Sequence, residues 1–117
     1  MPRIFKSIAL LIIVPALLIP SAAQTASHDQ VELLKARETV WRTFFAGDVK
    51  TLADLVPPDT IVISGDNPQW RHQADVLESS RKFHAAGGKL VRLEFPRTEV
   101  QWYGDVAIVW SSYSLET

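Results

Sequence analysis

The stretch "FFAGDVKTLADLVPPDTIVISG", residues 44–65, predicts a helix end, a tight corner, a second short helix and a strand in immediate succession. Gly47 suits the position after a helix end because glycine takes positive φ without a Cβ clash. Asp48 suits the N-cap of the short helix. Pro57 and Pro58 end that helix, since proline lacks the N–H and forces the preceding residue out of the α conformation. The β-branched run "TIVIS" that follows favours a strand.

The residues before this corner predict a long amphipathic helix. The segment "SHDQ" is typical of a capping box, in which Ser27 accepts from the backbone N–H of Gln30 and the Gln30 side chain reaches back. Apolar side chains then recur at helical spacing over about 16 residues. They are Leu33, Leu34, Val40, Trp41, Phe44 and Phe45. In the short helix after the corner, we expect Leu52, Leu55 and Val56 to point inward.

Turn signals and a third helix follow. The segment "GDNP", residues 65–68, predicts a turn. Helical spacing then returns from about Gln73 to Ala86, and Gly87 and Gly88 close the helix. One face of this helix is expected to carry Val76, Leu77, Ser80, Phe83 and His84.

The last third of the chain predicts strands. "KLVRLEF" and "TEVQWY" alternate in polarity, with a bend at Pro96, and a tight hairpin at Gly104 and Asp105 leads into "VAIVWSSYSLE". The order of elements predicts an α+β fold in which a long bent hairpin packs on a long helix. Because the last strand is apolar on both faces, we expect one face to meet the helices and the other to form a homodimer.

The first residues are typical of an export signal. Arg3 and Lys6 precede the apolar run "IALLIIVPALLI", and "SAAQ" offers the small residues that a signal peptidase requires. The run is shorter than the ~20 residues of a membrane span. We therefore expect a signal peptide over residues 1–23 and one exported domain, periplasmic or extracellular, over residues 24–117, with no membrane contact after cleavage. An uncleaved anchor is the alternative.

Composition excludes several classes of function. Of the chain's 12 basic residues, removal of Arg3 and Lys6 leaves 10 against 13 acidic ones, which argues against nucleic acid as a partner. There is no cysteine, so disulfides and thiolate chemistry are excluded. The 3 histidines are scattered without ligand spacing, and there is no glycine-rich phosphate loop, so we expect no metal and no cofactor.

The segments "VWRTFFAGDVKTLADLVPPDTIVISG" and "TEVQWYGDVAIVWSSYSL" resemble the NTF2-like superfamily, in particular its SnoaL-like and DUF4440 group. The shared pattern is an aromatic helix, a Gly-Asp corner, a short helix, a strand led by Asp59, and a late Gly-Asp hairpin. The resemblance implies a cone, in which a curved antiparallel sheet wraps on the helices. This chain has "WRHQ" where members usually have glycine before the third helix. Members also continue through two more strands, so the resemblance implies that C-terminal strands are missing after Thr117.

The same resemblance implies an apolar cavity for a small aromatic or polycyclic ligand. Six aromatic residues are the candidates for lining it: Trp41, Phe45, Trp70, Phe83, Trp102 and Tyr113. Enzymes of this superfamily use an acid or base held in the cone, and the candidates here are His84 and Asp59. Each has a structural alternative, since His84 suits the last turn of a helix and Asp59 suits a turn.

Three functions remain open at this point. The chain is a binding or accessory protein for a small apolar ligand, a lyase or isomerase that acts by proton transfer, or a structural homodimer without a ligand. The fold is common to all three, so it does not choose between them.

The export signal gives the first testable prediction. N-terminal sequencing of the protein recovered from the exporting cell should start at Gln24, because cleavage is expected after Ala23. A mature protein that still starts at Met1 would favour the membrane anchor.

Overall fold

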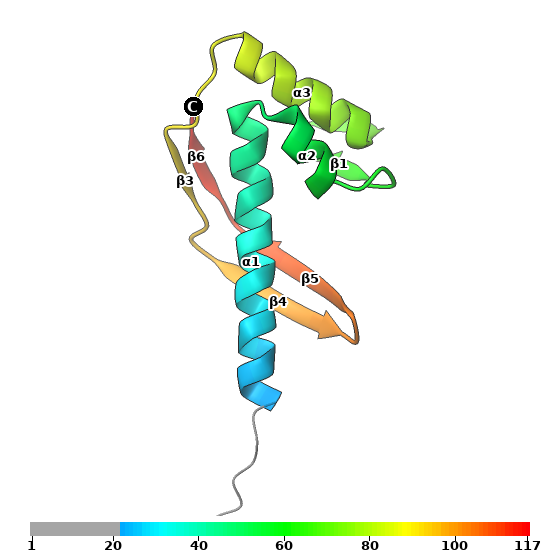
Figure 1. Ribbon diagram of the computed structural model, residues 1–117, viewed down its shortest axis with the longest axis vertical. Helices are drawn as coiled ribbons and strands as arrows, with labels where there is room; N and C mark the ends of the chain where they lie inside the picture. The colour runs from blue at the N-terminus through cyan, green and yellow to red at the C-terminus, as the bar shows by residue number, and fades with distance from the viewer. Residues whose placement is uncertain (1–21) are drawn as a thin grey trace, which may run out of the picture.

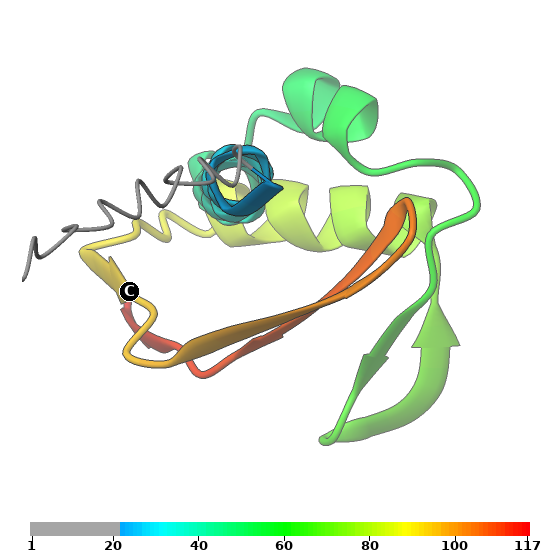
Figure 2. The same cartoon turned by 90° about the horizontal axis from the view of Figure 1, so that it is seen from below.

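The computed structural model describes residues 22–117, which form three helices and three small antiparallel sheets, an α+β fold (Figure 1). Viewed along the first helix, the helices lie on one side and the strand hairpins on the other (Figure 2). The elements are α1 (Ala22–Ala46), α2 (Val49–Leu55), β1 (Val62–Ser64), β2 (Asn67–Arg71), α3 (Gln73–Ala85), β3 (Arg92–Glu94), β4 (Thr98–Tyr103), β5 (Val106–Ser111) and β6 (Ser114–Glu116).

Helix α1 starts earlier than the sequence predicts. It runs unbroken through the expected capping box, so Ser27 is a helical residue and not an N-cap. The residues before Ser27 include three alanines, which have the highest helix propensity and allow the helix to extend. Most of the predicted leader, residues 1–21, lies outside the described residues. Within residues 22–117, no helix is long and apolar enough to cross a membrane.

The predicted corner between α1 and α2 is confirmed. Gly47 has a φ of 70°, and the Asp48 side chain accepts a hydrogen bond of 3.1 Å from the Thr51 N–H. Hydrogen bonds from the Thr51 side chain and backbone hold the pKa of the Asp48 carboxyl below its ordinary value. Because the pKa is lower in the folded state, the cap stabilises α2 at pH values above the unfolded-state pKa. This stabilisation is lost as the pH falls through the folded-state pKa. Asp48 thus lets the chain reverse within two residues of the end of α1.

Helices α2 and α3 pack on the end of α1. Leu52 and Val56 are buried as predicted, but Leu55 is exposed, so the expectation for Leu55 is wrong. The reason is that a helix of two turns has only one face toward its neighbours. On α3, the fully buried Ser80 donates a 2.5 Å hydrogen bond to the carbonyl of Phe44. This bond ties α3 to the aromatic turn of α1.

A hairpin that the sequence did not predict precedes α3. The turn at Gly65 and Asp66 is confirmed, but the chain beyond it returns as β2, which pairs antiparallel with β1. Pro68 and the polar residues around it have low strand propensity, so pairing with β1 overrides the local preference. Strand β1 also starts later than expected. Asp59 lies in a turn closed by a hydrogen bond from Thr60 N to the carbonyl of Pro57, and the strand begins at Val62.

The long bent hairpin is confirmed. Strand β3 pairs with β6, and β4 pairs with β5 across the turn at Gly104. The bend falls at Pro96, as predicted, and it separates the β3–β6 pair from the β4–β5 pair. The strands therefore form three two-stranded sheets and not one continuous curved sheet.

The outer face of the β4–β5 hairpin exposes large apolar side chains beside the polar Glu99 and Gln101. Tyr103 and Trp110 are 60% exposed, Val106 is 61% exposed and Ile108 is 40% exposed. Cross-strand pairing places these four side chains on one face. A face of this kind is typical of a surface that another chain covers. The homodimer expected through one face of the sheet stays a prediction.

Alanine at Gly47 should destabilise the fold more than alanine at Gly87. Both glycines have positive φ, 70° and 80°, so both variants incur left-handed strain of roughly 1–2 kcal/mol. A Cβ at Gly47 would also lie 2.5 Å from Cβ and Cγ of His84, whereas a Cβ at Gly87 meets nothing within 4 Å. The overlap should add roughly 1–3 kcal/mol to the loss at Gly47.

Denaturant melts of Gly47→Ala and Gly87→Ala against the wild type measure this difference. The Gly87→Ala variant is the matched control because it shares the strain but not the overlap. Equal losses of unfolding free energy in the two variants would show that α3 does not approach the end of α1 at His84.

Candidate functional site

An aromatic cluster connects α1 to α3 and to the bent hairpin. The ring centroids of Trp41 and Phe45 are 6.2 Å apart, and Phe45 meets Phe83 of α3 at 5.2 Å. On its other side, the Trp41 ring lies 4.6 Å from Tyr113 and 5.9 Å from Phe95, both at the bend of the hairpin. Trp41 is therefore the residue at which helices and hairpin meet.

Arg37, one turn before Trp41 on α1, fixes the hairpin at the same place. Its Nη1 donates to Thr98 Oγ1 at 2.8 Å and to Ser111 Oγ at 2.5 Å, on paired residues of β4 and β5. Its guanidinium carbon also lies 3.7 Å from the centre of the Phe95 ring, a cation–π contact. All of these partners belong to the hairpin, so Arg37 serves to attach the hairpin to α1.

A pocket lies between α1, α3 and the β1–β2 hairpin. It has a volume of about 270 Å³. Its lining is mostly apolar, with four side chains from one stripe of α1. The lining residues are Val40, Trp41, Phe44, Phe45, Val62, Arg71, Val76 and Ser79. We call it the Arg71 pocket, after the one charged residue in its lining.

Strand pairing sets the position of Arg71 in this pocket. Arg71 is the last residue of β2 and pairs directly with Val62 of β1, which also lines the pocket. Its Nη2 makes one long contact of 3.5 Å to Ser64 Oγ. Its Nε is buried and has no hydrogen-bond partner. The guanidinium thus has donors that no acceptor among the described residues uses.

The six aromatic residues predicted to line a cavity occupy three environments. Trp41 and Phe45 line the Arg71 pocket. Phe83 and Tyr113 do not line it but contact the rings of Phe45 and Trp41. Two tryptophans lie elsewhere: Trp70 is 64% exposed and Trp102 is 42% exposed, and neither has an aromatic partner in the described part of the chain.

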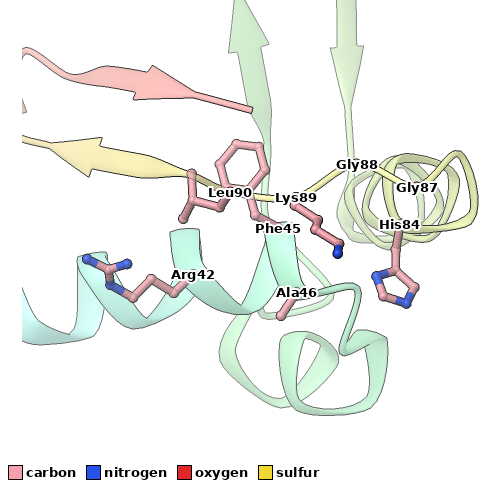
Figure 3. A pocket seen from close by; sticks show the side chains of 8 residues that line it. All are labelled: Arg42, Phe45, Ala46, His84, Gly87, Gly88, Lys89 and Leu90. Carbon is pink, nitrogen blue, oxygen red and sulfur yellow. The ribbon is translucent and has the colours of Figure 1, made fainter.

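The two residues considered as catalytic bases lie apart from this pocket. Asp59 is exposed in the turn before β1. His84 borders a separate open hollow of about 470 Å³ between the ends of α1 and α3 (Figure 3), together with Arg42, Phe45, Ala46, Gly87, Gly88, Lys89 and Leu90. Neither Asp59 nor His84 is among the residues that line the Arg71 pocket.

Sequence reasoning missed Arg71 and Gln73. The Gln73 side chain donates to the carbonyls of Ala53 and Val56, at 3.1 and 2.7 Å, and so satisfies the last turn of α2. Alternation after the "GDNP" turn was the available signal for Arg71, since it places Trp70 and Arg71 on opposite faces. Pro68 concealed that signal because it argues against a strand.

No group of three or more His, Asp or Glu residues in the described range could hold a metal ion. Comparison with known proteins adds no assignment: no family model, no curated protein and no solved structure matches the chain. The Arg71 pocket and its lining are therefore the features of the described residues that bear on function.

Proposed function

We propose that this protein binds a small aromatic or polycyclic ligand in the Arg71 pocket and has no catalytic role there. The observation that carries the proposal is the lining itself: three aromatic rings of α1, Trp41, Phe44 and Phe45, face a space with only two polar side chains. A largely apolar pocket with few polar groups is the usual form of a small-molecule site. The volume of about 270 Å³ lies just below the usual range of ligand pockets, which favours a small ligand.

Proton transfer is the weaker alternative for this pocket. A lyase or isomerase needs an acid or base within hydrogen-bond reach of the substrate. The lining offers an arginine and a serine, Arg71 and Ser79, and no carboxylate or imidazole. A guanidinium carries hydrogen-bond donors and no acceptor, so it cannot take up a proton as a base. These residue types favour binding over proton abstraction.

The wider setting of the pocket is part of the same proposal. We also propose an NTF2-like cone, because the helices lie on one side and the hairpins on the other (Figure 2). We further propose export, which rests on the sequence of residues 1–23, and a homodimer through the face that carries Ile108 and Trp110. In this arrangement the pocket and the dimer face lie on different elements.

Filling the pocket tests the proposal. N-phenyl-naphthylamine, a neutral aromatic probe whose fluorescence rises in apolar surroundings, should bind the wild type. Ser79→Phe places a ring in the space that the probe would occupy. The Ser79→Phe variant should bind the probe about tenfold more weakly or worse, because a loss of about 1.4 kcal/mol of binding free energy already raises the dissociation constant tenfold. Fluorescence titration measures the dissociation constants.

Lys82→Phe is the matched control, because it adds the same ring at an exposed position of the same helix. It should leave binding unchanged, and thermal melts should show that both variants fold. Equal affinity of the wild type and Ser79→Phe would place the probe on another surface, such as the exposed face of the hairpin, and would refute the proposal.

A further inference from the structure

We infer that the Arg71 pocket selects ligands with an anionic group, so that its natural ligand is an aromatic or polycyclic acid held by the Arg71 guanidinium. This inference rests on the proposed binding function and specifies the chemical class of the ligand. It comes from the contrast between Arg71 and the other arginines of residues 22–117.

Four of the six arginines in this range form ion pairs with glutamates at the surface. The pairs are Arg42 with Glu38, Arg81 with Glu78, Arg92 with Glu116, and Arg97 with Glu99. Arg37 lacks a carboxylate, and its Nε is buried without a hydrogen-bond partner like that of Arg71, but its outer nitrogen donates to two hydroxyls and its guanidinium lies on an aromatic ring. Arg71 has only the long contact to Ser64, and none of the ion pairs in the described range includes it.

The guanidinium of Arg71 is short of acceptors. Placing a cation beside apolar side chains removes water that would solvate it, and this costs free energy unless an anion or other acceptor replaces the water. Arg71 borders an apolar lining and its Nε is buried without an acceptor. A carboxylate or sulfonate in the pocket would accept charge-assisted hydrogen bonds, which are among the strongest that proteins form.

The elements around Arg71 also limit where the anion lies. Pairing with Val62 holds the Arg71 backbone, and the Ser64 hydroxyl on β1 contacts the outer nitrogen of its guanidinium. The aromatic side chains of the lining belong to α1, whereas Arg71 belongs to β2. A ligand that uses both elements therefore has its rings against Trp41 and Phe44 and its acid toward β2.

Two probes that differ by one group test the inference. Anilinonaphthalene sulfonate has the aromatic body of N-phenyl-naphthylamine with an added sulfonate. The wild type should bind the sulfonate about 10–100-fold more tightly, as expected for a hydrogen-bonded ion pair in a partly desolvated site. Arg71→Met should remove that preference and retain the affinity for the neutral probe, because methionine keeps the apolar contact without the charge.

Arg92→Met is the matched control, since it removes a surface arginine that already pairs with a glutamate. It should leave both affinities unchanged. A wild type that binds both probes equally, with binding lost in Ser79→Phe, would overturn the anion inference and leave the binding function standing. A wild type that binds neither probe would refute the binding function itself. If Arg71→Met does not melt cooperatively, the affinity ratio of the two probes in the wild type decides alone.

Discussion

The contact of one turn of α1 with the bend of the long hairpin is the interaction on which the rest of the structure depends. Arg37 and Trp41 lie one helical turn apart on the same face of α1. Arg37 reaches both strands through Thr98 and Ser111, and both α1 residues contact the ring of Phe95. A planar guanidinium that donates two hydrogen bonds and lies on an aromatic face is held in one geometry. The hairpin is thereby fixed relative to the helices by side chains and not by strand pairing.

This arrangement gives Trp41 two roles. Trp41 packs on Tyr113 of the hairpin. Together with residues of the next turn of α1, Trp41 also lines the Arg71 pocket. The hydrophobic residues that are fully or nearly buried in the described range are few: Leu52, Val56 and Leu93. The aromatic stripe is instead half-buried, as expected for residues that border a space as well as a core. Retention of an apolar, partly open space beside the core is a reason to expect binding and not only a structural role.

Local chemistry made much of this fold predictable. Gly47 allows the positive φ that ends α1, and Asp48 caps the N-terminus of α2. The structure has both features. Pro96 bends the hairpin for an equally local reason. The site was less accessible from sequence because it depends on pairing between segments. Pro68 disguised β2 as a loop, so the side chain of Arg71 could not be assigned to a face. Helical spacing identified the aromatic residues of α1. The tryptophans of the hairpins are also aromatic, and nothing in the sequence showed that they are exposed and lie away from the pocket.

The most direct test of the account is to locate a bound aromatic acid by nuclear magnetic resonance. Side-chain N–H signals report separately on the arginine Nε–H groups and the tryptophan indoles. Titration with anilinonaphthalene sulfonate should shift the Nε–H signal of Arg71 and the indole signal of Trp41, both of which line the pocket. The indole of Trp110, which donates to Gln101 on the outer face of the hairpin, should not move. Shifts at Trp110 with no change at Arg71 and Trp41 would place the ligand on the exposed sheet face and contradict the account.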